Sequence, residues 1–173
     1  MNTLASFKQI KVFVFDIDGV LTNGQILVLP NGVMARSMNV KDGYALQLAV
    51  KKGYKVVIIS GGFSQELHER FELLGVKDIF LKVMDKVQVL TDFITKNNLS
   101  FSNTLFMGDD LPDAEAMKLT ALPCCPNDAV QEIKSISGYV SPLNGGAGCV
   151  RDVIEKVMKL QNTWHHENHV AAK

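Results

Sequence analysis

The chain has 173 residues, the size of one globular domain with a single substantial core. Its 18 basic and 18 acidic residues cancel, so its net charge gives no reason to expect binding to nucleic acid or to an anionic membrane. No apolar run approaches the roughly 20 residues that span a bilayer, and the first residues lack the layout of a signal peptide.

Strand-like and helix-like stretches alternate along the chain. Apolar runs predict strands at 11–15, 55–59, 78–81, 104–107 and 138–141, and apolar residues at helical spacing predict helices over 44–52, 64–74, 85–97 and 150–160. This alternation is typical of a doubly wound α/β domain, in which helices cover both faces of a mostly parallel, Rossmann-like sheet. Such sheets bind ligands at the carboxyl ends of their strands, where we expect Asp16, Ser60 and Asp109 to meet.

One segment breaks the alternation. Residues 25–40 predict a β-hairpin with an Asn-Gly turn, placed directly after the first acidic pair and therefore over the expected site. No other insertion is long enough to form a lid. We therefore expect a single domain over residues 1–160, with this hairpin as its insertion and without a cap domain.

The polar tail, residues 161–173, is expected to be loose. The tail contains His165, His166 and His169. We expect them to be solvated rather than to bind zinc, because no cysteine or acidic residue stands at a spacing that would complete a zinc site. The cysteines are odd in number and lack a Cys-x-x-Cys spacing. Free thiols in a reducing cytoplasm are therefore expected for Cys124, Cys125 and Cys149.

The strongest candidate site is the pair Asp16 and Asp18, which follows the first predicted strand. Two carboxylates this close repel each other, and the crowding is costly unless a cation or chemistry uses it. Asp16 is placed to attack phosphorus and form an aspartyl phosphate, and Asp18 to protonate the leaving oxygen and then activate water. The plainer alternative is a solvated turn, because turns rich in acids are common.

Three further segments carry weaker signals. Ser60 and Gly61 stand between a strand and a helix, where a hydroxyl and backbone N–H groups form either an anion pocket or a simple helix cap. Lys86, near a helix start, could neutralise a phosphate, although most single lysines are solvated. The acidic residues after the fourth predicted strand suit a hard cation such as Mg²⁺. We expect Asp109 to bind the cation directly, and Asp110 and Asp113 to lie around that ligand without binding the cation themselves.

The order of these four segments resembles the motifs of the haloacid dehalogenase superfamily of phosphotransferases. Those motifs are Asp-x-Asp-Gly, a strand-end Ser or Thr, a Lys, and Gly-Asp-Asp-x-x-x-Asp, whose final acid stands one position early here, at Asp113. The similarity spans residues 12–151. The resemblance implies that Mg²⁺ is held by Asp16, the backbone carbonyl of Asp18, and Asp109.

Within that superfamily the chain is similar to the small, capless phosphatases that act on 3-deoxy-D-manno-octulosonate 8-phosphate. The matching segments are residues 16–22, 40–44, 85–86 and 144–148, together with Arg151. The resemblance implies a step in lipopolysaccharide precursor synthesis and a homotetramer in which neighbouring subunits cover each active site. Candidate substrate contacts are Asp42 and Gly43, which lie in a matching segment, and Arg36 and Lys41. Like Arg70, the two cations could meet a substrate carboxylate, although surface charge is the default for each.

Two departures from the family leave the substrate open. Gly62 stands where relatives often carry a charged residue, and Lys82-Val83 replaces a common Gln-Gly pair. A related nonulosonate 9-phosphate is the alternative substrate. Two other classes also remain: a non-catalytic homologous domain that regulates or oligomerises a partner, and a phospho-acceptor receiver domain, which lacks a proton-shuttling aspartate two residues after its phosphorylated one.

Overall fold

The computed structural model describes residues 3–165 and contains a six-stranded parallel sheet in the order β5-β4-β1-β6-β7-β8. The strands are β1 (Val12–Phe15), β4 (Lys55–Ile59), β5 (Asp78–Phe80), β6 (Thr104–Met107), β7 (Leu122–Cys125) and β8 (Tyr139–Val140). The helices are α1 (Thr3–Gln9), α2 (Val40–Lys51), α3 (Gln65–Leu73), α4 (Lys86–Lys96), α5 (Ala114–Lys118), α6 (Gln131–Ile136) and α7 (Cys149–Leu160). The predicted doubly wound α/β class is confirmed.

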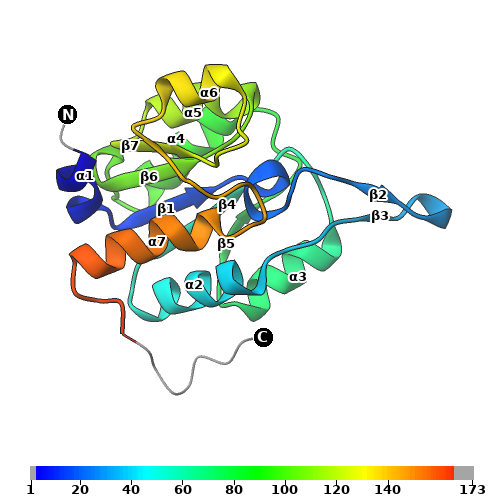
Figure 1. The fold of residues 1–173 in the computed structure, drawn as a ribbon, viewed down its shortest axis with the longest axis horizontal. Coiled ribbons are helices and arrows are strands. Elements are labelled where there is room, and N and C mark those ends of the chain that lie inside the picture. The colour runs from blue at the N-terminus through cyan, green and yellow to red at the C-terminus, as the bar shows by residue number, and fades with distance from the viewer. Residues whose placement is uncertain (1–2, 166–173) are drawn as a thin grey trace.

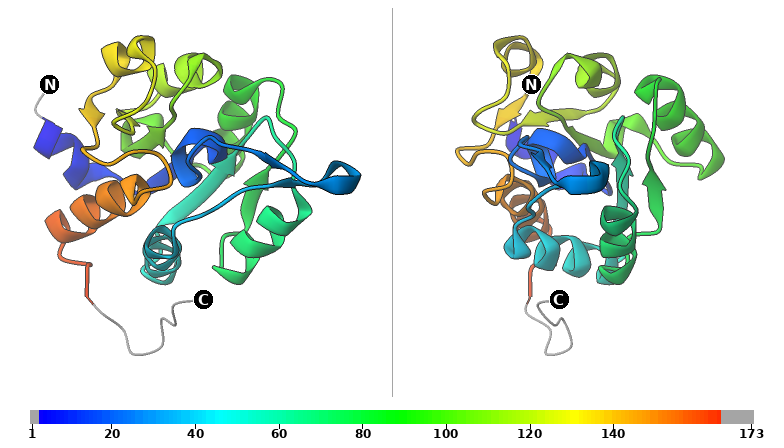
Figure 2. Two further views of the ribbon diagram at one scale, coloured as in Figure 1. Left: turned by 45° about the vertical axis from the view of Figure 1, so that its right-hand side comes forward. Right: turned by 90° about the vertical axis from the view of Figure 1, so that its right-hand side faces the viewer.

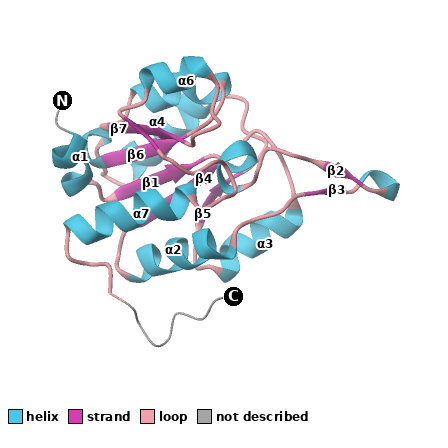
Figure 3. Cartoon of the chain, in the orientation of Figure 1, coloured by secondary structure: helices cyan, strands magenta, loops and turns pink. Residues whose placement is uncertain are grey.

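Helices lie on both faces of the sheet, as Figure 1 and Figure 3 show. Successive side chains of a strand point to opposite faces, so the four buried residues of β1 serve two cores. Phe13 and Phe15 pack on the side of α2, α3 and α7, whereas Val12 and Val14 pack on the side of α4, α5 and α6. A strand that is apolar on both faces is typical of a covered parallel sheet.

Strand β1 lies at the point where the winding of the sheet reverses. Its last residue, Phe15, pairs with Ile58 of β4 on one side and with Met107 of β6 on the other. The chain fills one half of the sheet with β4 and β5 before it crosses to β6, β7 and β8. The reversal opens a crevice at the carboxyl ends of β1 and β6, which is where such folds bind ligands.

Side-chain caps fix where the helices begin. Ser64 accepts a hydrogen bond from the N–H of Leu67 at the start of α3, and Asp85 accepts one from Gln88 at the start of α4. Helix α2 begins at Val40 rather than at the predicted residue 44, because the Asn39 side chain caps it. Strand β7 and helices α1, α5 and α6 were not expected, since they are short and lack a clear hydrophobic period.

The predicted hairpin is present, with short strands β2 (Leu27–Val28) and β3 (Met34–Ala35) joined by the turn Pro30–Gly32. Its expected position over the site is only partly right. The hairpin base lies beside the loop that follows β1, but its tip extends away from the sheet and helices (Figures 1 and 2). Several of its large apolar side chains are exposed: Leu27, Val28, Val33 and Met34.

The expectation of a loose tail is wrong for the first residues after α7. Gln161 donates from Nε2 to the carbonyl oxygen of Ile10 at 2.8 Å and accepts from the Tyr54 hydroxyl at 2.9 Å. Trp164 packs edge-on against Tyr44, with ring centroids 6.2 Å apart. Of the three histidines, His165 is exposed, whereas His166 and His169 lie outside the described residues.

All three cysteines are free and buried, as predicted. Among residues 3–165, no helix has both the length and the apolar character needed to cross a membrane.

Asp42 and Gly43, two of the expected substrate contacts, lie in the first turn of α2. Both are buried. An Asp42 carboxylate oxygen accepts a hydrogen bond from the backbone N–H of Arg151 at 2.7 Å, which joins α2 to the start of α7. Burial, only partly offset by these backbone donors, raises the pKa of Asp42 to about 6.

This raised pKa predicts how stability varies with pH. The folded state holds the Asp42 proton more tightly than the unfolded chain, whose aspartate titrates near 3.8. Its contribution to the free energy of unfolding is therefore present below pH 4 and is lost as pH rises through about 6. In Asp42→Asn this dependence is absent, so the wild type should lose roughly 2 to 3 kcal/mol relative to the variant over that range.

Urea unfolding of both proteins from pH 4 to pH 8 measures this difference. Other titrating groups are shared and cancel in the comparison. A stability difference that stays constant with pH would contradict the assignment.

Candidate functional site

Asp16 stands at the end of β1, held by a backbone hydrogen bond from its N–H to the carbonyl oxygen of Met107 at 3.1 Å. The chain then turns over Ile17–Leu21, where Asp18 and Gly19 leave the helical backbone conformation and Gly19 has a φ of +87°. A side chain at Gly19 would overlap the carboxylate of Asp109. Glycine is therefore needed here both for the backbone conformation and for the close approach of two acidic loops.

Lys86, the first residue of α4, reaches into this crevice. Its ammonium nitrogen lies 2.9 Å from Oδ1 of Asp16 and 2.6 Å from Oδ1 of Asp113, and all three side chains are buried. Burial by itself lowers the pKa of Lys86, but the charges of the two carboxylates reverse this, and the net shift is upward. The lysine therefore stays protonated and fixes the nucleophile candidate in place.

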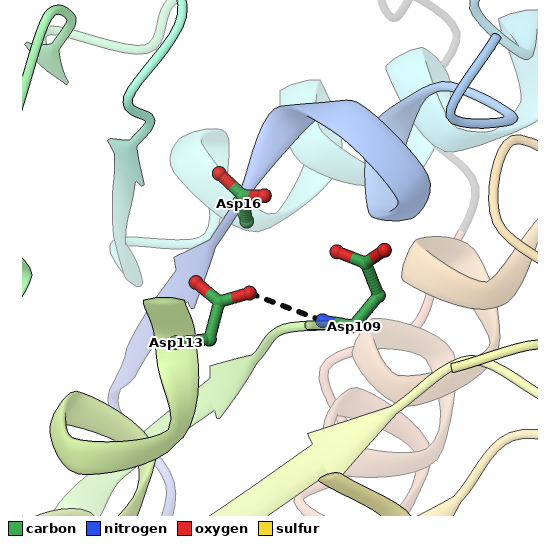
Figure 4. Close-up of side chains that lie close together, drawn as sticks. All are labelled: Asp16, Asp109 and Asp113. Carbon is green, nitrogen blue, oxygen red and sulfur yellow. Dashed lines mark hydrogen bonds between the residues drawn. The ribbon is translucent and has the colours of Figure 1, made fainter. Parts of the chain in front are cut away.

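Asp109 follows β6 by two residues and completes an acidic group with Asp16 and Asp113. Oxygens of the three carboxylates lie within 4.8 Å of one another. Figure 4 shows them converging from the end of β1, the loop after β6 and the turn before α5. Asp113 also accepts the backbone N–H of Asp109 at 3.1 Å, which ties the two loop residues together.

Crowding changes the acidity of this group. Burial, followed by the charge of Asp113, raises the pKa of Asp16 to about 6, and burial with the charges of Asp113 and Asp16 raises the pKa of Asp109 to about 7. The buried Oδ1 of Asp16 accepts no hydrogen bond of good geometry within the described part of the chain, although Lys86 is ion-paired to it. An all-carboxylate donor set with an unsatisfied oxygen fits Mg²⁺, which prefers hard oxygen ligands.

Ser60 and Gly61 border the same crevice, as expected. The Ser60 hydroxyl is buried and accepts a hydrogen bond from the N–H of Gly62 at 3.3 Å. The cleft has a volume of about 410 Å³ and brings together residues from four stretches of the chain. Its lining is Asp16, Asp18, Gly24, Ser60, Gly61, Gly62, Val83, Met84, Lys86, Asp109, Asp110, Pro112 and Asp113.

Asp18 also lines the cleft. Arg36 binds both of its carboxylate oxygens, from Nε at 2.7 Å and from Nη2 at 3.1 Å, and the Thr22 hydroxyl donates to Oδ1 at 3.3 Å. These contacts were not expected from the sequence, which gave Arg36 only as a substrate contact. The distance of 18 residues between the partners leaves no local pattern that could have revealed the pair.

The remaining expected residues differ in their position. Asp110 lines the cleft but is exposed and caps the following turn, accepting the N–H of Leu111 at 2.7 Å. Lys41 is exposed and borders a different cavity, next to α7. The glycine-rich segment, residues 144–148, packs against the turn after β1 of its own chain. There the N–H of Gly146 donates to the carbonyl oxygen of Val20 at 2.9 Å.

Comparison with known proteins agrees with this architecture. The haloacid dehalogenase-like hydrolase family matches residues 74–154. A 3-deoxy-D-manno-octulosonate 8-phosphate phosphatase of Escherichia coli is 29% identical over 160 residues, covering 92% of this chain and 85% of that protein. The crystal structure of such a phosphatase from Moraxella catarrhalis, in complex with a magnesium ion, a phosphate ion and KDO, superposes with a TM-score of 0.90 at 31% identity, covering 94% of this chain and 93% of that one.

The chain belongs to this haloacid dehalogenase family of capless phosphatases. A cobalt-bound structure of the Haemophilus influenzae relative also superposes, with a TM-score of 0.87 at 28% identity, covering 91% of this chain and 92% of that one. The chain is thus a phosphomonoester hydrolase, and Mg²⁺ is the cofactor that its acidic group fits. This assignment excludes the receiver-domain alternative and leaves the non-catalytic alternative without support.

The acidic group predicts a specific response to magnesium. In Asp109→Asn, removal of one of three crowded charges should stabilise the protein without metal, because Asp109 ionises against burial and two neighbouring carboxylates. The same change should weaken Mg²⁺ binding on the order of 100-fold, so the rise in melting temperature with Mg²⁺ seen for the wild type should largely vanish.

Asp110→Asn is the matched control, because its side chain lies one residue away and outside the acidic group. Melting temperatures across a MgCl₂ titration, with MgCl₂ replaced by NaCl of equal ionic strength as reference, give the measurement. Equal responses of the two variants would show that Asp109 is not a ligand.

Proposed function

We propose that the chain hydrolyses the phosphate ester of a 2-keto sugar acid, with 3-deoxy-D-manno-octulosonate 8-phosphate as its substrate, in the cytoplasm and as a step toward lipopolysaccharide precursors. The observation that carries the proposal is the buried contact of Asp16 with Lys86 inside a cleft that Asp18, Ser60 and Asp109 also line. Support for the substrate comes from the named activity of the Escherichia coli and Moraxella catarrhalis relatives. Support for the compartment comes from three free thiols.

The first half of the reaction forms a covalent phosphoenzyme. A carboxylate oxygen of Asp16 attacks phosphorus in line with the leaving oxygen, and the bond from phosphorus to the sugar oxygen breaks. Asp18 gives its proton to that oxygen, so the sugar leaves as an alcohol. When bound by Asp16, Asp109 and the backbone carbonyl of Asp18, Mg²⁺ offsets the negative charge shared by the nucleophile and the phosphoryl group.

The second half releases phosphate. Asp18, now a carboxylate, takes a proton from a water molecule that attacks phosphorus, and the bond to Asp16 breaks. The Ser60 hydroxyl, the N–H of Gly61 and the Lys86 ammonium donate to the phosphoryl oxygens in both halves. Because these groups are held by the sheet rim and by α4, they need little rearrangement between the two steps.

Asp113 has a further part in this arrangement. It binds Lys86 at 2.6 Å and the N–H of Asp109 at 3.1 Å, and so links the phosphate-binding cation to the metal ligand. We infer that Asp113 orients these two residues. Asp110, exposed at the cleft rim, has no such contact with the acidic group.

A panel of phosphate esters tests the proposal. The wild type should show its highest kcat/KM on the octulosonate 8-phosphate, well above a nonulosonate 9-phosphate and neutral sugar phosphates. Asp16→Asn should lose activity on every ester by at least about 1,000-fold, because an amide cannot form the phosphoenzyme, while its circular dichroism stays that of the wild type.

A nonulosonate 9-phosphate as the best substrate would replace the proposed substrate with its alternative but leave the chemistry intact. A nucleotide or phosphoprotein as the best substrate would overturn the substrate class. Turnover of Asp16→Asn at the wild-type rate would remove Asp16 as the nucleophile.

We also infer that the chain works as a homo-oligomer, as a tetramer by its resemblance to the family. The hairpin supports this, because it carries exposed Leu27, Val28 and Met34 on a two-stranded ribbon whose outer edges pair with no other described strand. A single such ribbon is marginally stable in water, so its contacts with a second copy would stabilise it.

The double variant Leu27→Glu/Val28→Glu should therefore reduce the mass in solution from four chains toward one, as measured by light scattering after size-exclusion chromatography. Leu119→Glu, which charges an exposed leucine after α5, is the matched control and should keep the mass unchanged. An unchanged mass in the hairpin variant would contradict assembly through this segment.

A further inference from the structure

The contact between Arg36 and Asp18 has a geometry that fixes a carboxylate in orientation as well as in distance. Two nitrogens of one guanidinium bind two oxygens of one carboxylate, Nε to Oδ1 at 2.7 Å and Nη2 to Oδ2 at 3.1 Å. A planar fork that binds both oxygens prevents the carboxyl group from rotating, which a single-point donor such as lysine does not.

The burial of the two partners shows which of them meets the substrate. The Arg36 side chain is 7% exposed, whereas the Asp18 side chain is 32% exposed and lines the cleft. Arg36 does not line the cleft but borders a smaller adjacent cavity, which Asp18 also lines. A substrate in the cleft therefore reaches Asp18, while Arg36 can act only through it.

Gly62 provides the space for this pair. A Cβ atom at this position would lie 3.3 Å from Oδ2 of Asp18, 3.6 Å from Nη2 of Arg36 and 3.7 Å from the Ser60 hydroxyl. Any larger side chain that turned this way would compete with the guanidinium for the same space. The absence of a side chain at Gly62 therefore leaves room for Arg36, which comes from the base of the hairpin, to bind Asp18.

Arg36 is itself anchored at that base. Its Nη1 donates to the backbone carbonyl oxygen of Met34 in β3 at 3.2 Å. The isolated bridge between Thr22 and Met38 holds the returning chain next to the loop that carries Asp18. The position of the guanidinium is thus set by backbone contacts rather than by a flexible side chain alone.

We propose that Arg36 is a positioning residue of the phosphatase reaction, which holds the Asp18 carboxylate in the orientation needed for proton transfer with the leaving oxygen and with water. The inference rests on the proton-transfer role of Asp18 proposed above. It replaces the expectation that Arg36 binds the substrate.

The test compares two leaving groups. A sugar alkoxide needs a proton as it leaves, whereas p-nitrophenolate is stable without one. In Arg36→Gln, the single-turnover rate of phosphoenzyme formation should therefore fall about 30- to 100-fold on the best sugar phosphate, within the range of general acid–base catalysis, but by less than about fivefold on p-nitrophenyl phosphate. Hydrolysis of the phosphoenzyme, which uses Asp18 as the base after either ester, should slow by the same factor for both. KM should change little on either ester, and Arg36→Lys should restore only part of the lost kcat because it binds one oxygen at a time.

Two controls separate this role from a structural one. Arg151→Gln removes an arginine that pairs with Glu155 on α7, away from the cleft, and should leave both rates unchanged. In a double-mutant cycle, Arg36→Gln should add almost nothing to the loss already caused by Asp18→Asn, because both changes disable the same proton transfer.

Three outcomes would overturn the inference. Equal losses in the rate of phosphoenzyme formation on both esters, with a lowered melting temperature, would make Arg36 a structural residue, and a raised KM with unchanged kcat on the sugar acid would make it a substrate contact. Wild-type kcat in Arg36→Gln, beside an inactive Asp18→Asn, would remove the positioning role alone. Wild-type kcat in Asp18→Asn itself would instead overturn the proposed role of Asp18, and this inference with it.

Discussion

The crowding of Asp16, Asp109 and Asp113 around the single ammonium of Lys86 is the constraint on which the site depends. One positive charge cannot balance three carboxylates. Burial, together with the charges of the neighbouring carboxylates, raises the pKa of Asp16 to about 6 and that of Asp109 to about 7. A divalent cation offsets the remaining repulsion. A phosphate ester can then approach, because the nucleophile no longer repels it. The excess negative charge of these side chains thus favours binding of the cation before binding of the phosphate ester.

The sheet is what makes this crowding possible. An acidic side chain on a mobile loop would move away from its neighbours, but Asp16 continues a strand that is fully buried and paired on both sides. Its N–H is bonded to Met107 of β6, so the loops after β1 and β6 start from adjacent strands. The paired strand ends thus keep the starts of the two acidic loops close together.

Residues at strand ends could be predicted from the sequence because a local pattern sets their position. Asp16, Ser60 and Asp109 each follow an apolar run, and the carboxyl ends of parallel strands meet at one edge. Lys86 was placed by the helix start that Asp85 caps. The roles of Asp42 and Arg36 could not be read in this way, since their partners lie 109 and 18 residues away and no periodicity links them. A polar residue beside a motif is equally consistent with a ligand contact and with a buried structural hydrogen bond.

The same limit explains the unpredicted elements. Strand β7 contains Pro123 and two cysteines, and its pairing with β6 comes from the order of the sheet rather than from a strong strand pattern. Gln161 and Trp164 look like a polar tail, yet they pack because Ile10, Tyr54 and Tyr44 lie next to the end of α7. Long-range packing decides such segments, and it becomes visible only when the elements are assembled.

The residues around the cleft have different origins, and this has a consequence for specificity. One side of the cleft carries Lys86, Asp109 and Asp113, which are held by the start of α4 and the segment after β6. We propose that this side binds the metal ion and the phosphate group common to all substrates. Asp18 and Gly62 also line the cleft, and Arg36 binds Asp18 from outside that lining. These residues come from the turn after β1, the loop after β4 and the hairpin base. Changes in these outer segments can alter which sugar is accepted while the central charges, held by backbone pairing, stay in register. We therefore expect the hairpin side to govern the proton transfers at Asp18 as well as the choice of sugar, and the sheet side to govern the metal and phosphate contacts.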